Sequence, residues 1–172
     1  MSMVLKPQDI LILLKLVASK EIEWSYPSLA HDLYMSVSEV HTGIKRARAA
    51  RLMDSQRRVP LKKALEEFLI HGVKYAFPPT RGGPVRGMPT GYAAPPLVDL
   101  IVQPNEPPPV WPYLEGQVRG NEFSPLYKSV PIAAAKDKGL YEFLTLVDAI
   151  REGRAREEKF AIEEIKARLR KR

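Results

Sequence analysis

The first fifty residues carry apolar side chains at the three- and four-residue spacing of amphipathic helices. Proline is favoured in the first turn of a helix, so we expect helices to begin at Pro7 and at Tyr26-Pro27. The first apolar stripe consists of Ile10, Leu11, Leu14 and Val17, and the second of Leu29, Ala30 and Leu33. The second helix must be short, because Ser36 begins a new one.

Ser36 and Glu39 have the spacing of a capping box, in which each side chain accepts the other residue's backbone N–H. They predict a third helix whose buried stripe is Val37, Val40, Ile44 and Ala47. Gly43 lies in the middle of this helix, where it lets another helix or a phosphate backbone approach closely. The opposite face is polar and basic, and it carries Ser38, His41, Thr42, Lys45, Arg46 and Ala49.

The pattern changes after residue 60. A helix is predicted for residues 60–71, followed by a strand at 73–77 where apolar and polar residues alternate. Residues 78–84 form a loop and 85–89 a second strand, so a hairpin carrying Arg81 and Arg86 is expected.

Proline dominates the chain from residue 78 to 131, which holds 13 of the 16 prolines. We interpret residues 95–136 as a strap over the domain surface, anchored by Trp111 and Tyr113, or alternatively as a docking segment for a protein partner. Residues 137–172 are helical again, with Asp137 as the N-cap residue and a break at Gly153.

The composition narrows the class of protein. Of 172 residues 45% are hydrophobic and 27% charged, which is typical of a globular chain. The absence of cysteine excludes disulfides, a thiolate nucleophile and cysteine-ligated zinc. The longest apolar run, residues 10–14, is too short for a membrane span, and no signal peptide is evident, so we expect a cytoplasmic protein.

Positive charge is concentrated in one segment. The net charge is +7, and residues 45–63 hold eight basic residues and one acid, whereas residues 77–135 hold four of each sign. Such a cluster favours a polyanionic partner, nucleic acid above all, although a basic face can also be merely solvated.

Residues 29–47 resemble the L-A-x-x-L-x-x-S-x-x-x-V-x-x-x-I-x-x-A/L pattern of helix-turn-helix proteins. The following Arg51-Leu52-Met53 is similar to the G-L-[IV] that precedes the wing in MarR-like winged helix-turn-helix regulators. Tyr34 departs from the pattern, because a turn glycine is common at its position. The resemblance implies a winged helix-turn-helix domain with a small β-hairpin wing (1–94). With the proline-rich strap (95–136) and the C-terminal helices (137–172), the expected fold is mainly α.

The resemblance also implies a transcriptional regulator that binds double-stranded DNA and needs no cofactor. Ser38, His41, Thr42 and Lys45 would face base edges in the major groove, next to the capping Ser36. Flanking phosphates would be bound by Arg46 and Arg48, the segment after the helix would add Arg57 and Arg58, and the wing would add Arg81 and Arg86.

The sequence also bears on two other classes of function. Catalysis is not expected, because the sequence has no nucleophile elbow, no histidine metal cluster and no close aspartate pair beside a glycine loop. The alternative to DNA binding is a winged-helix protein-interaction module, such as an antitoxin or an adaptor.

We expect a homodimer held together by the helices of residues 137–172, because these carry more apolar side chains than a peripheral appendage needs. The competing arrangement folds both helices back onto their own domain and leaves a monomer.

Overall fold

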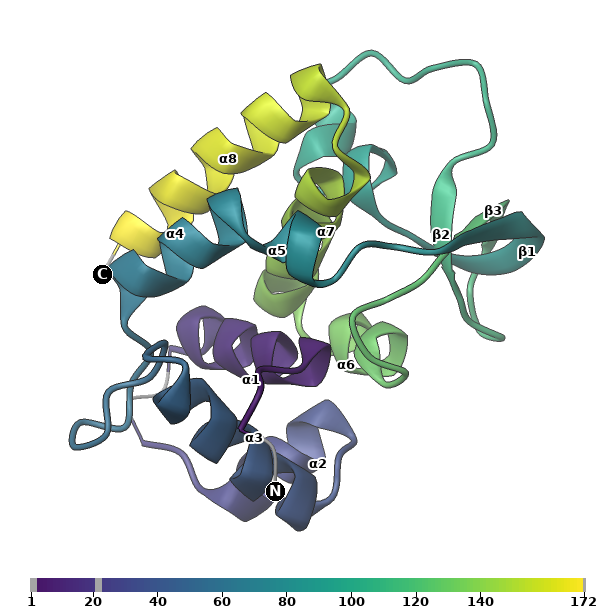
Figure 1. The fold of residues 1–172 in the computed structure, drawn as a ribbon. Helices are drawn as coiled ribbons and strands as arrows, with labels where there is room; N and C mark the ends of the chain where they lie inside the picture. Colours follow the sequence, from purple (N-terminus) through teal and green to yellow (C-terminus); the bar gives the residue numbers. More distant parts are fainter. Residues whose placement is uncertain (1–2, 21–22, 172) are drawn as a thin grey trace.

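The computed structural model describes residues 3–20 and 23–171, so Arg172, the last residue of the predicted C-terminal helix, lies outside the described part. Figure 1 shows a mainly α-helical chain with a small sheet at one side, which confirms the predicted class. The helices are α1 (Pro7–Ala18), α2 (Tyr26–Leu33), α3 (Val37–Ala49), α4 (Lys62–His71), α5 (Val73–Ala76), α6 (Val130–Ala135), α7 (Lys138–Glu152) and α8 (Ala155–Arg170). The strands are β1 (Arg81–Pro89), β2 (Pro109–Pro112) and β3 (Val118–Phe123), and two 3₁₀ turns, η1 (Gly91–Ala93) and η2 (Leu97–Asp99), lie between β1 and β2.

The local signals in the first fifty residues placed the helices correctly. α1 and α2 have proline in their first turns. The capping box of α3 is complete: the Glu39 amide donates to Ser36 Oγ at 3.1 Å, and the Ser36 amide donates to Glu39 Oε2 at 2.7 Å. Of the predicted apolar stripe, Val40, Ile44 and Ala47 are fully buried, whereas Val37 in the first turn is exposed.

At Gly43, α3 packs tightly against α1. A Cβ atom at this position would lie 2.5 Å from the Cδ1 of Ile12 and 2.9 Å from Oδ1 of Asp9. Both neighbours are fully buried, so neither has space into which to withdraw. The sequence-based expectation of a close approach is therefore confirmed, and the approaching element is a helix of the same chain.

Gly43→Ala should destabilise the protein by about 1–3 kcal/mol through overpacking, even though alanine is the better helix former by about 1 kcal/mol. The matched control is Gly139→Ala in α7, where the nearest atom to the new Cβ lies at an ordinary 3.6 Å and stability should be unchanged or slightly raised. Urea denaturation compares the two. A stabilising effect at both positions would contradict the packing argument.

The hydrophobic core is shared by the N-terminal and C-terminal helices. One cluster of buried residues includes members of α1, α3, α4, α7 and α8. In α7 the fully buried positions include Leu140, Leu146, Val147 and Ile150. As predicted, Asp137 caps α7 by accepting the Leu140 amide at 3.0 Å, and Gly153 ends it with a φ of 78°.

This core corrects the predicted role of residues 137–172. Their apolar side chains pack against α1, α4 and α5 of the same chain. This is the alternative to the dimer, in which both helices fold back onto their own domain. The physical reason is that α1 is buried on all sides over residues 9–14, so it needs helices on more than one side, and α3 and α7 both pack against it. The homodimer stays a prediction, but the apolar side chains of residues 137–172 no longer support it, because they are buried within one chain.

The proline-rich region forms a sheet. β1 is antiparallel to both β2 and β3, and β2 is parallel to β3, so the three strands close on one another. The closure needs a glycine at position 87, because a Cβ there would lie 1.9 Å from the carbonyl oxygen of Trp111. Trp111 itself is fully buried, which confirms its predicted role as an anchor.

The predicted hairpin of residues 73–89 is wrong. Residues 73–76 form α5, and β1 pairs with strands from further along the chain. Val73 and Phe77 alternate with polar residues, but they also stand four residues apart and so share one side of a helical turn. Val73 is fully buried there, and α5 packs against α7. A run of five residues fits both the two-residue period of a strand and the 3.6-residue period of a helix.

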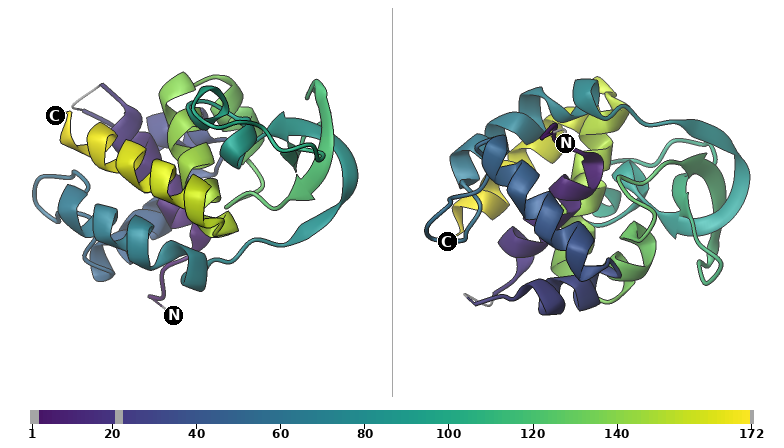
Figure 2. Two further views of the ribbon diagram at one scale, coloured as in Figure 1. Left: turned by 90° about the horizontal axis from the view of Figure 1, so that it is seen from above. Right: turned by 60° about the horizontal axis from the view of Figure 1, so that its bottom comes forward.

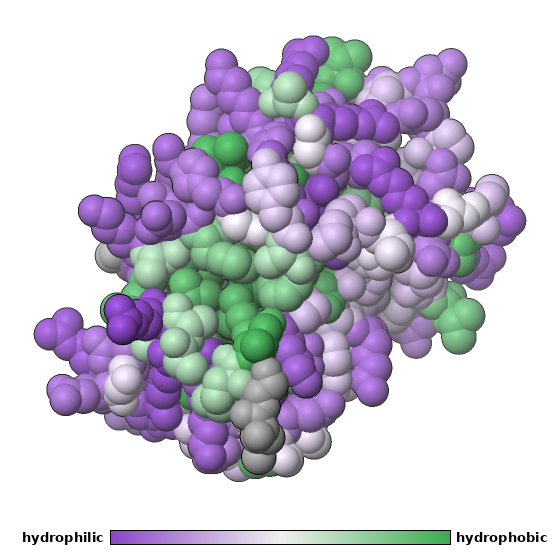
Figure 3. Space-filling view, in the orientation of Figure 1, coloured by the Kyte–Doolittle hydropathy of each residue, from purple (hydrophilic) through white to green (hydrophobic). Residues whose placement is uncertain are grey.

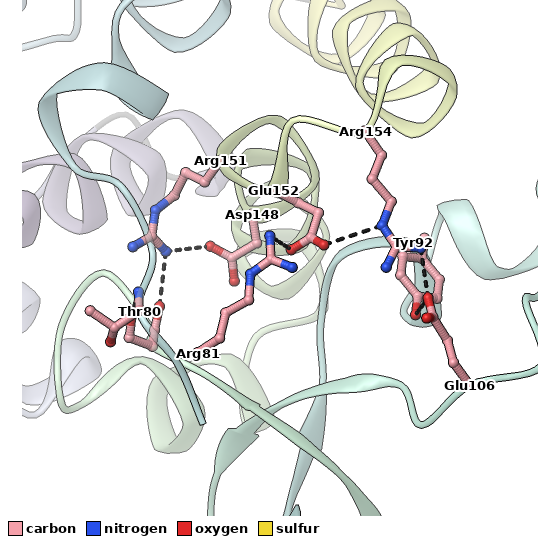
Figure 4. Close-up of polar contacts among 9 residues, drawn as sticks. Thr80, Arg81, Tyr92, Glu106, Asp148, Arg151, Glu152 and Arg154 are labelled. Atoms are coloured by element: carbon pink, nitrogen blue, oxygen red, sulfur yellow. Dashed lines mark hydrogen bonds and ion pairs between the residues drawn. The ribbon is translucent and has the colours of Figure 1, made fainter. Parts of the chain in front are cut away.

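A buried polar group joins the sheet to α7. Asp148 is 1% exposed, and its Oδ2 accepts the Thr90 hydroxyl at 2.6 Å and the Trp111 indole N–H at 2.7 Å. Its Oδ1 accepts from Arg151 at 2.8 Å (Figure 4), and the same guanidinium donates to the carbonyls of Phe77 and Ser124. Burial raises the pKa of the Asp148 carboxyl, and the guanidinium and the other donors oppose that rise.

Candidate nucleic-acid interface

The outer face of α3 presents polar side chains to solvent. Ser38, His41 and Lys45 are exposed and stand three and four residues apart, so they form one ridge. Thr42 beside them is half-buried, and its hydroxyl donates to the carbonyl of Ser38 at 2.9 Å. Ser36 is also exposed, at the cap of the helix. The right-hand view of Figure 2 brings α3 toward the reader.

Arg46 does not belong to this face, which corrects its prediction as a phosphate ligand. Its side chain is 7% exposed and forms a two-bonded ion pair with the fully buried Asp9 of α1: Nε at 2.7 Å and Nη2 at 2.8 Å. These hydrogen bonds raise the pKa of Arg46 further. The helical period places position 46 roughly 100° from Lys45, toward α1. Arg46 therefore joins two helices and is not available to DNA.

Arg48 is intermediate in exposure between the exposed Lys45 and the buried Arg46. It is half-buried at the edge of the outer face, two turns beyond His41 and one turn beyond Ile44. Its Nε is buried and has no hydrogen-bond partner among the described residues. The aliphatic part of the side chain is thus packed against the protein, and only the end of the guanidinium can serve a ligand.

The segment directly after α3 forms a small hairpin, here called the 53–60 hairpin. Met53 pairs with Pro60 in an antiparallel bridge, and the Asp54 amide donates to the carbonyl of Val59 at 2.8 Å. At the tip, Asp54 Oδ1 accepts the amides of Gln56 and Arg57, both at 2.8 Å. These backbone bonds lower the pKa of the Asp54 carboxyl. The turn therefore presents two exposed arginines, Arg57 and Arg58.

Arg81 and Arg86, the predicted wing arginines, lie elsewhere. Figures 1 and 2 place their strand β1 on a different side of the molecule from α3. Arg81 pairs with Glu152 of α7 at 2.6 Å, and Glu152 also pairs with Arg154 (Figure 4). Arg86 faces Arg119 across the β1–β3 pair. Both are therefore removed from the predicted interface, because the strand that carries them pairs with β2 and β3.

Two residues with positive φ stand where the helix-turn-helix pattern has glycine. Tyr34, which ends α2, has a φ of 54°, and Arg51, which follows α3, has a φ of 61°. Glycine adopts this left-handed backbone at the least cost, which explains why the pattern favours it. The backbone at both turns thus has the conformation that the pattern requires, with other side chains.

A row of stacked side chains links the 53–60 hairpin to α3. The Arg58 guanidinium lies 4.1 Å from the centroid of the Trp24 ring, and the Trp24 indole N–H donates to the Arg58 carbonyl at 2.8 Å. Trp24 meets the edge of Tyr26 at 5.3 Å, and Tyr26 contacts the ring of His41 at 4.9 Å. The stack fixes the hairpin relative to the outer face of α3. Sequence reasoning missed Trp24 and Tyr26, although two aromatic residues beside a basic cluster were a usable signal.

The start of α3 is held by a second, distant segment. Tyr127, which precedes α6, donates its hydroxyl hydrogen to Glu39 Oε1 at 2.7 Å. The Ser36 amide first and then this hydroxyl lower the pKa of the Glu39 carboxyl. Glu39 is therefore ionised at neutral pH, which is the state that caps the helix.

The described residues contain no group of three or more His, Asp or Glu side chains that could hold a metal ion. In the same part of the chain, every helix is too short or too polar to cross a membrane. Comparison with known protein families, with curated proteins and with solved structures found no match.

Proposed function

We propose that the protein is a winged helix-turn-helix transcriptional regulator that binds double-stranded DNA through α3. In this proposal α2 and α3 are the two helices of the motif, α3 is the recognition helix, and the 53–60 hairpin is a short wing. The observation that carries it is the position of the hairpin: the Arg58–Trp24–Tyr26–His41 stack ties Arg58 to the exposed ridge of α3, and Arg57 next to it is exposed.

The chemistry of the ridge is compatible with contacts to base edges. Lys45 can donate to guanine O6 and N7, and serine hydroxyls read bases permissively because they both donate and accept. Arg57 and Arg58, with the end of Arg48, would bind the flanking phosphates. A homodimer that places two α3 helices about 34 Å apart remains a prediction for this mode of binding.

The test is a salt titration of duplex binding. The variant Lys45→Ala/Arg57→Ala removes two exposed cations, so the slope of log K against log[salt] should fall by about 1.8. Binding can be followed through Trp24, because Trp111 is buried and Arg58 stacks on Trp24 at the interface. The matched control is Arg156→Ala/Lys159→Ala, two exposed cations at the start of α8, and its slope should equal that of the wild type.

Thermal unfolding must show that both variants are folded. If the wild type does not bind duplex DNA, or if both variants lose the same slope, α3 is not a DNA-reading helix. The result would then favour the alternative function, a winged-helix module that binds another protein.

A further inference from the structure

A basic groove lies where four elements meet: the end of α1, the start of α4, the start of α7 and the end of α8. It comprises two adjoining hollows of about 370 Å³ and 310 Å³, which share Lys62 and Leu169. The basic side chains that line it are Lys20, Lys62, Lys63, Arg168, Arg170 and Lys171, and the acidic ones are Glu66 and Glu142. We call this the α4–α8 groove.

Among the described residues, the basic side chains that line the groove outnumber the acidic ones. Arg168 pairs with Glu142 at 3.1 Å and also with Glu164, so this arginine is occupied. Lys63, Arg170 and Lys171 are exposed. Like charges gathered along one groove raise one another's energy, and a bound anion lowers it.

The helix dipole does not account for this cluster. It favours cations at the end of α8, where Arg170 lies. It disfavours them in the first turn of α4, where Lys62 and Lys63 stand and no acidic residue is present. The groove therefore gathers cations from the start of α4, where the helix dipole disfavours them, and from the end of α8, where it favours them. Such clustering of cations is typical of a phosphate-binding surface.

The groove continues the proposed DNA interface. Lys62 and Lys63 follow the 53–60 hairpin directly in the chain. Figure 1 shows the end of α8 beside the start of α4, with that hairpin below them on the same side. In Figure 3 this edge is mainly hydrophilic, whereas the apolar side chains gather over α1 between α3 and α4. A phosphate backbone that leaves the hairpin can thus pass onto the groove without crossing the apolar area.

We infer that the α4–α8 groove binds backbone phosphates of the same duplex, flanking the segment that α3 contacts. This rests on the proposed function and extends it, because the protein then covers more DNA than one recognition helix and a short wing. The contact is sequence-independent, since lysine and arginine reach phosphates and no base edge enters the groove.

The test uses the full-length protein, a duplex of about 30 base pairs, roughly 100 Å long, and salt titrations. Arg170→Ala/Lys171→Ala should lower the salt slope by about 1.8, which corresponds to a roughly twelve-fold smaller loss of affinity between 50 and 200 mM salt. Arg156→Ala/Lys159→Ala removes the same charge from the other end of α8 and should have no effect. The variant that combines Arg170→Ala/Lys171→Ala with Lys45→Ala/Arg57→Ala should have a slope about 3.6 below that of the wild type, because the groove and the α3 interface bind one duplex.

The outcomes separate this inference from the proposed function. If the wild type binds no duplex, the proposed function fails. If Lys45→Ala/Arg57→Ala lowers the slope but the groove variant matches its control, the inference is overturned and the function stands. Sodium tripolyphosphate is the second probe: if it raises the melting temperature of the wild type but not of the groove variant, while DNA slopes are equal, the groove takes a free anion and the inference is likewise overturned.

Discussion

Arg46→Ala should lower the free energy of unfolding by about 3–5 kcal/mol, because it leaves the carboxylate of Asp9 buried without its cation. Of the three hydrogen bonds that the Asp9 carboxylate accepts, only the one from the Lys6 amide, at 2.9 Å, would remain. Total stabilities of small proteins are about 5–15 kcal/mol, so this is a large share. Chemical denaturation measures it.

Lys45→Ala is the matched control, since the neighbouring cation is exposed and its removal should change stability by no more than about 0.5 kcal/mol. The double variant Asp9→Leu/Arg46→Met should be more stable than Arg46→Ala alone, because an apolar pair can replace a buried ion pair. Equal stability of Arg46→Ala and Lys45→Ala would show that the Asp9–Arg46 pair contributes little. Where the expected loss is found, weaker DNA binding by an Arg46 variant reports on folding and not on phosphate contact.

The helices around the candidate site could be predicted because their signals are local. Ser36 and Glu39 lie within one turn of each other, and Gly153 ends α7 through its own backbone conformation. Signals of this kind are complete within a few residues, so the sequence alone shows them. The ridge of Ser38, His41 and Lys45 followed from the helical period in the same way.

The long-range pairings could not be predicted. The helical period shows that position 46 points away from Lys45, but nothing near Arg46 in the sequence indicates that Asp9, 37 residues earlier, would meet it. The same holds for Tyr127 and Glu39, which are 88 residues apart. An arginine in a basic cluster is ordinarily solvated, so a buried one cannot be distinguished from its neighbours before the packing of α1 on α3 is known.

The position of the hairpin was mispredicted for a related reason. The 53–60 hairpin is closed by a single bridge and has few strand-favouring residues, so it gives almost no periodic signal. The segment from 73 to 89 contains alternation and glycine, which are typical of a hairpin, but its strand pairs with residues 109–123 instead. A proline-rich sequence gives little indication of strand pairing, because proline cannot donate to a ladder.

Asp148→Ala should be as damaging as the Arg46 change, at about 3–5 kcal/mol, although Asp148 lies far from the candidate interface. The substitution removes the acceptor of three donors at once: the Thr90 hydroxyl, the Trp111 indole and the Arg151 guanidinium. Arg151 is 3% exposed, so water cannot replace the lost carboxylate without opening the core, and only the carbonyls of Phe77 and Ser124 remain for it.

Two measurements distinguish this loss from a general effect of substitution in a helix. Glu163→Ala, at an exposed position of α8, should leave stability within about 0.5 kcal/mol of the wild type. The NMR signal of the Trp111 indole N–H should shift in Asp148→Ala under conditions where the variant is folded, because its bond to a carboxylate is lost. A variant with wild-type stability and an unmoved indole signal would show that Asp148 does not join the sheet to α7. With the expected result, the Asp148 carboxylate is a buried link between the proline-rich strands and α7, beside the Arg81–Glu152 ion pair and the bond from the Tyr141 hydroxyl to the Pro89 carbonyl. α7 in turn packs against α1, which supports α3 and the candidate interface.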